Sequence, residues 1–430
     1  MAKPKLALIP AAQGTKFYSV LPSDGTGDFT FTRGSVATRI NAQGLIENVA
    51  SGQSRLDYPL IDGVQKGCPH HILEPQSTNL ITYSESFSNS YWTKTGASIV
   101  LNSTISPDGS LNASKLVEDN TNSLHAIFQN AGITIPSGNN TLSVFVKSNG
   151  RNFFQVRTGS AGGVDNSPLY ANFDLINNSE TASSVGVINS KIETYPNNWK
   201  KISITFNLSS GTSVALVFQP ILSGTSVINE SYQGDGTSGV YIFGAQLEAG
   251  SFPTSYIPTN GESGGVTRSA ETASGAGQSS TFNDSEGVLM FETKFLQNAR
   301  IGITNTDDSD EVVIGLATGL GIFYRIRENT SNPITQFVGV SEFENNKIAL
   351  KYKSTETSFF VNGFELNTNS TSYTLNGLNE LAFKSEGTNF YGNAKQLQYF
   401  DSALADTQLE QLTSWQSFRD MANGQLYTIE

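Results

Sequence analysis

Few side chains in this sequence have the types and spacing that catalysis needs. The chain has only three histidines, His70, His71 and His125, and a single cysteine, Cys68. Cys68, Pro69 and the histidine pair are consecutive, so a Cys/His metal or catalytic site is one interpretation. However, adjacent residues of a strand point to opposite faces, so two neighbouring histidines rarely bind one ion. We therefore interpret this segment as structural.

Glycoside hydrolysis would need two carboxylates about 5–10 Å apart across the scissile bond. Glu292 stands alone in the segment MFETKF, and the acidic residues 307–311 (DDSDE) are typical of an exposed turn. These acidic residues also lack the glycine and the final glutamate of an EF-hand loop. The sequence therefore favours a protein that is not an enzyme, and a polysaccharide depolymerase is the alternative.

Aromatic side chains are the candidates for sugar binding, because an aromatic face stacks on the apolar face of a pyranose beside Asn, Asp and Gln. In residues 76–260 these candidates are Tyr91, Trp92 and Tyr170. Tyr170 follows the glycine-rich turn 159–163 and is the better surface candidate. For Trp92 a buried core position is the favoured interpretation, and sugar binding is the alternative.

The charge and composition of the chain exclude several classes of partner. The net charge is -12 and the sequence pI is about 4.8, which argues against binding to nucleic acid and to anionic lipid. One cysteine allows no internal disulfide, which fits assembly in a reducing cytoplasm. No run approaches the roughly 18 apolar residues of a membrane span, and the short apolar run near the N-terminus is not a signal peptide. We expect synthesis in a host cytoplasm without membrane insertion.

Short apolar or alternating segments separated by Gly, Asn, Ser and Pro predict an all-β chain. Segments such as TLSVFVKS, FFQVRTG and KKISITFNL predict an antiparallel sandwich in residues 76–260. Residues 261–267 (GESGGVT) are typical of a hinge. Residues 268–430 contain NKIALKYKS and SFFVNGFEL, in which Asn362 and Gly363 predict a type I′ turn. Residues 1–75 show no core of their own.

Two phrases resemble a known class of proteins. Residues 73–92 (LEPQSTNLITYSESFSNSYW) and 243–258 (FGAQLEAGSFPTSYIP) resemble the first and last segments of a carbohydrate-binding-module-like jelly roll in structural proteins of tailed bacteriophages. RGSVATR, which begins at Arg33, and the RLDY phrase at Arg55 resemble the front of phage appendage proteins. The strand order after residue 268, with an ALAD phrase and a predicted helix at 407–414, resembles the concanavalin A/laminin-G-like sandwich.

This resemblance implies the rest of the prediction. The fold would be a tandem of antiparallel β-sandwiches, a jelly roll and then a concanavalin-like domain, after an extended N-terminal segment. The protein would be an exposed head or tail fibre or decoration protein of a virion. Residues 1–75 would attach it to other virion proteins, it would form a homo-oligomer with a trimer favoured, and it would bind host polysaccharide. A bacterial surface adhesin is a further alternative, which would require a secretion signal.

A structural calcium ion is a second implication of the resemblance. Jelly-roll binding modules hold such an ion with backbone oxygens and one or two carboxylates. Glu248 lies where a ligand would fall, and Glu85 lies close to the first strand of the module. The alternative is that Glu248 accepts hydrogen bonds from the loop that leaves the last strand, residues 250–258, which we call the exit loop.

Overall fold

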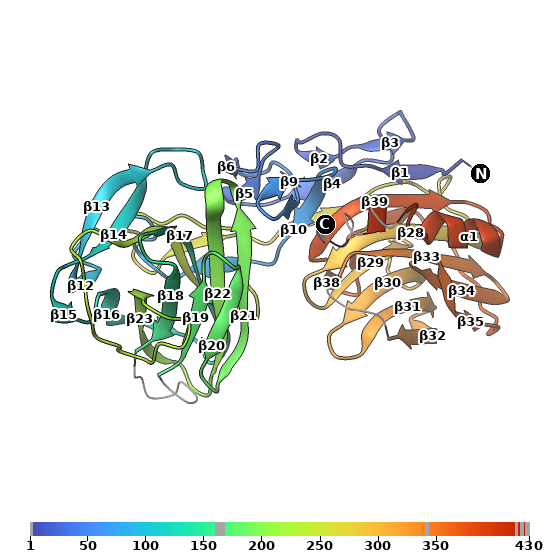
Figure 1. Cartoon of the computed structure of the whole chain (residues 1–430). Coiled ribbons are helices and arrows are strands. Elements are labelled where there is room, and N and C mark those ends of the chain that lie inside the picture. The colour runs from blue at the N-terminus through green and yellow to red at the C-terminus, as the bar shows by residue number, and fades with distance from the viewer. Residues whose placement is uncertain (1–2, 160–167, 340–343, 418–419, 422–424, 426–430) are drawn as a thin grey trace.

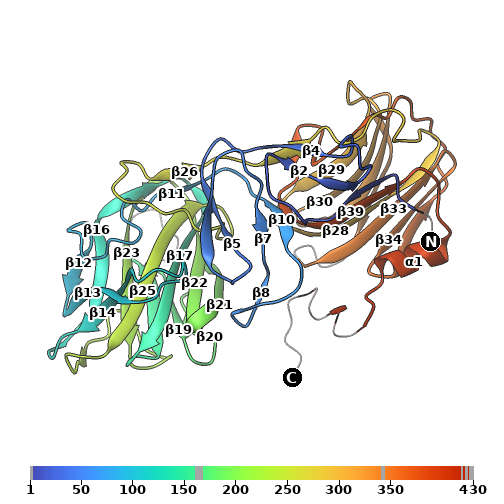
Figure 2. The same ribbon diagram turned by 90° about the horizontal axis from the view of Figure 1, so that it is seen from above.

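The computed structural model describes residues 3–159, 168–339, 344–417, 420–421 and 425. Two β-sandwiches lie side by side, and the N-terminal segment runs across one side of both (Figures 1 and 2). Every pairing between the strands is antiparallel in both sandwiches. The predicted fold class, an all-β chain of tandem antiparallel sandwiches, is confirmed. Among the described residues, no helix is long and apolar enough to cross a membrane.

The first sandwich has two six-stranded sheets, whose strand orders are β12-β16-β23-β18-β19-β20 and β13-β14-β25-β17-β22-β21. Apolar side chains from the inner faces, such as Phe154, Leu142 and Ile204, form one dry core. The strands are β12 (Thr93–Thr95), β13 (Ala97–Thr104), β14 (Ala113–Glu118), β16 (Ala126–Ile135), β17 (Gly138–Asn149), β18 (Phe153–Thr158), β19 (Tyr170–Asp174), β20 (Ser179–Ser183), β21 (Val187–Tyr195), β22 (Trp199–Leu208), β23 (Thr212–Ile221) and β25 (Gly239–Ala249).

The second sandwich packs the five-stranded sheet β32-β31-β30-β29-β36 on a larger sheet with the path β3-β1-β39-β28-β33-β34-β35. The strands after residue 280 are β28 (Glu286–Phe295), β29 (Ala299–Thr304), β30 (Glu311–Ala317), β31 (Gly321–Glu328), β32 (Ser331–Val338), β33 (Asn346–Lys353), β34 (Glu356–Val361), β35 (Phe364–Asn369), β36 (Glu380–Ala382) and β39 (Gly392–Phe400). Helix α1 (Asp406–Thr413) covers the outer face of the larger sheet, where Leu409 joins a small apolar cluster with Met290 and Phe360.

Two local predictions in this sandwich are confirmed. Asn362 and Gly363 join β34 to β35 with φ values of 52° and 91°, which is the pair of positive angles that a type I′ turn needs. The predicted helix at 407–414 is α1, displaced by one residue.

The N-terminal segment adds strands to the second sandwich. β1 (Leu6–Leu8) and β10 (His70–Leu73) both pair with β39, while β3 (Ser19–Leu21) pairs with β1 and forms one edge of the sheet. β2 (Lys16–Phe17) and β4 (Phe29–Thr32) form a small sheet with β27 (Thr272–Ser274). Phe17 and Phe29 are buried in the core of the second sandwich, so this segment contributes side chains to that core.

The remaining part of the N-terminal segment reaches the first sandwich. The hairpin of β5 (Ala37–Ile40) and β6 (Ile46–Val49) packs beside it, with Ile46 in a cluster with Phe145 and Trp199. β26 (Val266–Arg268), which overlaps the predicted hinge 261–267, pairs with β11 (Ser77–Asn79). The connection between the two sandwiches is therefore built from paired strands.

Candidate binding cleft between the two sandwiches

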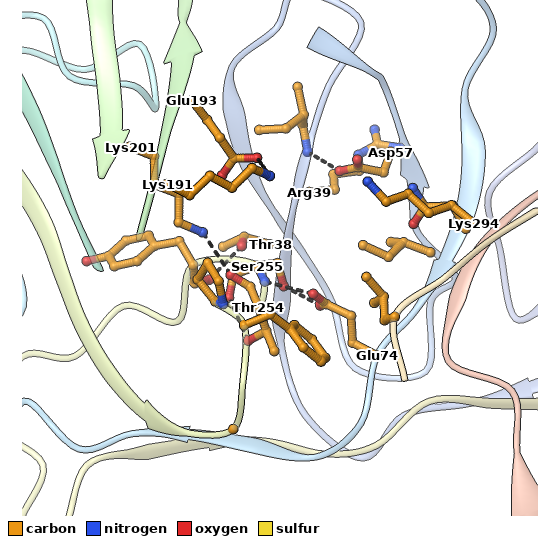
Figure 3. Close-up of a pocket in the computed structure, with 18 of the residues that line it drawn as sticks. Thr38, Arg39, Asp57, Glu74, Lys191, Glu193, Lys201, Thr254, Ser255 and Lys294 are labelled. Carbon is orange, nitrogen blue, oxygen red and sulfur yellow. Dashed lines mark hydrogen bonds and ion pairs between the residues drawn. The ribbon is translucent and has the colours of Figure 1, made fainter. Parts of the chain in front are cut away.

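A cavity of about 680 Å³ lies where the N-terminal segment and the two sandwiches meet. We call it the cleft. Its walls are β5, β21, the exit loop, and the end of β28 with the residues that follow it. Figure 3 shows side chains from these walls facing one another, with Lys201 and Glu193 on one side and Lys294 on the other. The cleft therefore depends on how the two sandwiches are held together.

A buried ionic network holds the chain together beside the cleft. It contains three arginines and two glutamates, all at the ends of short strands: Arg33, Arg55, Arg268, Glu74 and Glu271. Arg55 donates to Glu271 Oε1 at 2.8 Å and to Glu74 Oε2 at 2.8 Å, and Arg33 Nη1 donates to Glu271 Oε1 at 2.7 Å. Arg268 donates to Glu74 and to the carbonyl of Pro75. The network therefore holds one more positive charge than negative charges, and each carboxylate contacts two arginines.

The network also fixes the exit loop. The Ser255 amide donates to Glu74 Oε1 at 2.8 Å, and the Ser255 hydroxyl donates to Glu74 Oε2 at 2.6 Å. Burial alone would raise the pKa of Glu74, but Arg268 and Arg55 hold that pKa well below its ordinary range. Glu74 is therefore a permanent anion, and the loop that lines the cleft is attached to it.

Glu248 also holds the exit loop, at Thr254, the residue before Ser255. Its carboxylate accepts hydrogen bonds from Ser77 Oγ at 2.9 Å, from the Thr254 amide at 3.1 Å and from the side chain of Gln246. Burial raises the pKa of Glu248. Of the two interpretations of Glu248, the structure contains the one in which it bonds the exit loop.

Asn79 joins the two sequence phrases that bracket the first sandwich. Its amide nitrogen donates to the carbonyls of Ala245 and Ile257 at 3.1 and 2.8 Å, and its oxygen accepts from the amides of Ile81 and Leu247 at 3.1 Å each. All four hydrogen-bonding positions of this buried side chain are used. The two phrases are therefore joined in space, since Asn79 of the first phrase bonds the backbone of the second.

The cleft is lined by a group of charged side chains and by five aromatic rings, Phe145, Tyr195, Phe252, Tyr256 and Phe295. Phe252 lies half-buried in the exit loop. Lys201 Nζ donates to the carbonyl of Thr254 at 2.9 Å, and Lys191 Nζ lies 2.5 Å from Glu193 Oε1. Burial would raise the pKa of Glu193, but Lys191 and Lys201 lower it. The arrangement offers a flat apolar face together with fixed donors and acceptors.

The predicted sugar-binding residues lie outside the cleft. Trp92 is 1% exposed, belongs to the core of the first sandwich, and donates its indole N–H to the carbonyl of Tyr83 at 2.9 Å. Its faces are covered by packing, which corrects the interpretation of Trp92 as a sugar-stacking residue. Tyr91 is half-buried and lines a smaller cavity of about 240 Å³ with Gln129 and Thr134.

Tyr170 is half-buried in β19, directly opposite Arg157 of β18. It lies on the first sandwich away from the cleft lining. The structure thus does not bring Tyr91, Trp92 and Tyr170 together in one site. Whether Tyr91 or Tyr170 contacts a sugar stays a prediction.

Glu85 and Glu248, the two predicted calcium ligands, both accept hydrogen bonds from protein groups. Glu85 accepts a hydrogen bond from the Tyr256 hydroxyl at 2.9 Å, and Glu248 accepts those named above. Within the described parts of the chain, no group of three or more His, Cys, Asp or Glu side chains is placed to hold a metal ion. A calcium ion held by backbone oxygens and one or two of these carboxylates stays a prediction.

The histidines have structural environments. His71 stacks on Phe17 with ring centroids 3.8 Å apart and an angle of 5° between the planes. Burial lowers the pKa of His71 to about 3, so the ring is neutral. His70 faces Asp57 at 3.5 Å, and both ring nitrogens of His125 lie within hydrogen-bond distance of backbone carbonyls. Cys68 is exposed.

No local pattern in the sequence points to the cleft residues. Phe252 lies in the phrase 243–258, where its type and position predict only part of the loop that leaves the last strand. Lys191 and Lys294 are separated by about 100 residues and lie in ordinary alternating strands. Only the docking of the two sandwiches places them on one cavity, and no local pattern encodes that docking.

No protein family model and no curated protein matches this sequence. Several solved structures are similar to parts of it. The CBM40 domain of the Ruminococcus gnavus IT-sialidase bound to alpha2,3 sialyllactose has 17% identity, 33% of this chain and 88% of that chain covered, and a TM-score of 0.27. Domain 4 of AbnA, a GH43 extracellular arabinanase from Geobacillus stearothermophilus in complex with arabinotriose, is 13% identical in sequence. The match covers 34% of this chain and 73% of that chain, with a TM-score of 0.28. Mouse laminin alpha1 domains LG4-5 are 9% identical in sequence. The match covers 80% of this chain and 96% of that chain, with a TM-score of 0.22. These similarities carry no argument about function.

Proposed function

We propose that this chain is a non-enzymatic, glycan-binding protein of a tailed-bacteriophage particle, displayed as a head or tail appendage, and that it holds saccharide in the cleft. The observation that carries the binding proposal is the cleft, a cavity of about 680 Å³ with the half-buried ring of Phe252 beside polar side chains from both sandwiches. An apolar ring face with hydrogen-bonding groups around it suits a pyranose, which has one apolar face and a rim of hydroxyls.

The carboxylates of the cleft support binding rather than hydrolysis. Glu74 is held by two arginines, Glu193 is paired with Lys191, and Asp57 accepts the Ile40 amide at 2.7 Å. A glycosidase would need one protonated acid and one free carboxylate across the bond. The depolymerase alternative predicts release of new reducing ends from a polysaccharide, which a reducing-sugar assay would detect.

Attachment to a particle is supported by the phrases at Arg33 and Arg55 and by the surface of the first strands. Ile9, Tyr18 and Val20 are exposed at or next to β1 and β3, on the open edge of the larger sheet. Exposed apolar side chains on a free strand edge suit contact with another protein. We propose that this edge contacts neighbouring virion proteins and that the chain forms a homo-oligomer, with a trimer favoured. Light scattering of the purified chain measures the mass of the assembly.

The binding proposal is tested with Phe252→Ala, using an array of bacterial surface polysaccharides and then calorimetry on the strongest ligand. We expect the wild-type chain to bind and Phe252→Ala to lose at least about fivefold in affinity. Phe364→Ala is the matched control, because Phe364 is 71% exposed on β35, far from the cleft lining. Binding that survives Phe252→Ala unchanged, or no binding to any polysaccharide, contradicts the proposal.

A further inference from the structure

Three lysines reach the cleft from three different strands. Lys191 lies on β21, Lys201 on β22 and Lys294 on β28, so both sandwiches contribute to the group. The chain as a whole has a net charge of -12. A cavity with three lysines therefore differs in charge from the average surface of this protein. Figure 3 shows that the lysines face the same space.

The three lysines differ in how they are neutralised. Lys201 is committed to the Thr254 carbonyl, and its ammonium also lies 5.9 Å from the centre of the Phe145 ring. Lys191 is paired with Glu193, and both side chains are partly exposed, at 52% and 35%. Within the described parts of the chain, the side chain of Lys294 has neither a hydrogen bond nor an ion pair. It differs in this from Lys191, which has a carboxylate partner, and from Lys201, which has a carbonyl partner.

The acidic groups around the cleft are already engaged. Glu193 belongs to Lys191, Asp57 bonds the Ile40 amide, and Glu74 belongs to the arginine network. Burial and the neighbouring Lys191 lower the pKa of Lys294, while Glu193 and Glu344 act in the opposite direction. An anion arriving at Lys294 would therefore relieve an unfavourable charge, and a neutral ligand would not.

We propose that the cleft takes an acidic saccharide, a sugar bearing a carboxylate, with the carboxylate on Lys294 and the sugar ring against Phe252. This inference rests on the proposed function, because it names the class of ligand for the same cleft. Lys191 is the second cation near the ligand and can exchange Glu193 for the sugar carboxylate. A lysine ammonium donates to a carboxylate as a charge-assisted hydrogen bond, which is stronger than a hydrogen bond between neutral groups.

The overall negative charge does not prevent such binding. Charges farther away than about 8–10 Å are largely screened at physiological ionic strength, whereas the lysines touch the ligand. The acidic surface should therefore slow the approach of a polyanion while the local lysines retain it. The affinity for the acidic sugar should fall when salt is added, and the affinity for a neutral sugar should not.

The test uses the full chain and a panel of uronate-containing and sialate-containing oligosaccharides, each beside the same oligosaccharide with its carboxyl groups reduced to alcohols. We expect at least one acidic form to bind about tenfold more tightly than its reduced form. Lys294→Gln should remove this preference by lowering the affinity for the acidic form to about that of the reduced form. Lys384→Gln is the matched control, since Lys384 is exposed on the second sandwich outside the cleft lining.

Thermal unfolding without ligand provides the folding check, and Lys294→Gln should unfold no earlier than the wild-type chain. Equal affinity for acidic and reduced forms, or a preference that survives Lys294→Gln, overturns this inference and leaves the proposed function standing. Failure of every oligosaccharide and polysaccharide to bind overturns both.

Discussion

Replacing Arg55 by Met should greatly destabilise the docking of the two sandwiches. Arg55 is completely buried, and its guanidinium makes five hydrogen bonds: two to Glu271, and one each to Glu74, the Thr38 carbonyl and Ser255 Oγ. Met fills a similar volume but supplies no donor and no charge. After the substitution, the two buried carboxylates of Glu74 and Glu271 have two arginine partners instead of three.

The size of the effect follows from what remains. Glu271 keeps Arg33 and Glu74 keeps Arg268, so neither carboxylate becomes entirely uncompensated. Breaking a buried ion pair by removing one partner destabilises by about 3–5 kcal/mol, and the remaining arginines place the expected loss near the lower end, about 3 kcal/mol. Because Arg55 connects the N-terminal segment to Ser255 of the exit loop, we expect the loss to fall on docking more than on either sandwich core.

Urea unfolding followed by tryptophan fluorescence and circular dichroism measures this loss. The wild-type chain should unfold with coincident transitions, and Arg55→Met should shift the transition or split it into two. The control is Lys5→Met, which removes an ion pair between Lys5 and Asp401 whose side chains are 51% and 41% exposed; its effect should stay below about 1 kcal/mol. If Arg55→Met unfolds within 1 kcal/mol of the wild type, as Lys5→Met should, the reasoning about the network is wrong.

Two further predictions concern single buried side chains. The pKa of His71 falls from 6.5 to about 3 on folding. Below pH 6.5 the unfolded state therefore binds more protons than the native state, so the free energy of unfolding should be about 2 kcal/mol lower at pH 5 than above pH 6.5. His71→Phe keeps the stack on Phe17 and should lower this pH dependence by that amount; unfolding at pH 7.5 and 5.0 measures it, and an unchanged slope would refute it. Asn79→Ala removes four hydrogen bonds and should lower the free energy of unfolding by about 2–4 kcal/mol, whereas exposed Asn48→Ala should change it by less than about 0.5 kcal/mol. Equal losses in the two asparagine variants would contradict this.

Local features of the fold could be predicted from the sequence. The apolar segment TLSVFVKS predicted a strand, which is β17, and its buried side chains Leu142 and Phe145 belong to two apolar clusters on opposite faces of the sheet. Asn362 and Gly363 predicted their turn because few other residues accept positive φ in succession. These signals depend on residues a few positions apart, so the sequence contains them directly.

Pairings between distant segments could not be predicted in this way. β1 pairs with β39, almost 400 residues later, and three apolar residues do not specify such a partner. The network arginines and glutamates look like ordinary surface charges in the sequence, because charged residues are rarely buried unless they are paired. Arg55 and Glu271 are 216 positions apart in the sequence and contact each other only in the tertiary structure.

The candidate site shows the same division. For Glu248 the sequence allows two roles, a calcium ligand or an acceptor of hydrogen bonds from the exit loop. The structure contains a hydrogen bond of the second kind, from the Thr254 amide. Trp92 is a candidate binding residue because it is aromatic, and residue type does not distinguish a buried ring from an exposed ring. Phe252 and Lys294 became candidates only through the cavity that they share.

The most direct test of the account is a crystal structure of the full chain with an acidic oligosaccharide bound. We predict that the sugar lies between the two sandwiches, with its ring against Phe252 and a carboxylate oxygen within hydrogen-bond distance of Lys294 Nζ. A sugar bound on the outer face of the first sandwich beside Tyr170, with the cleft empty, would contradict the account.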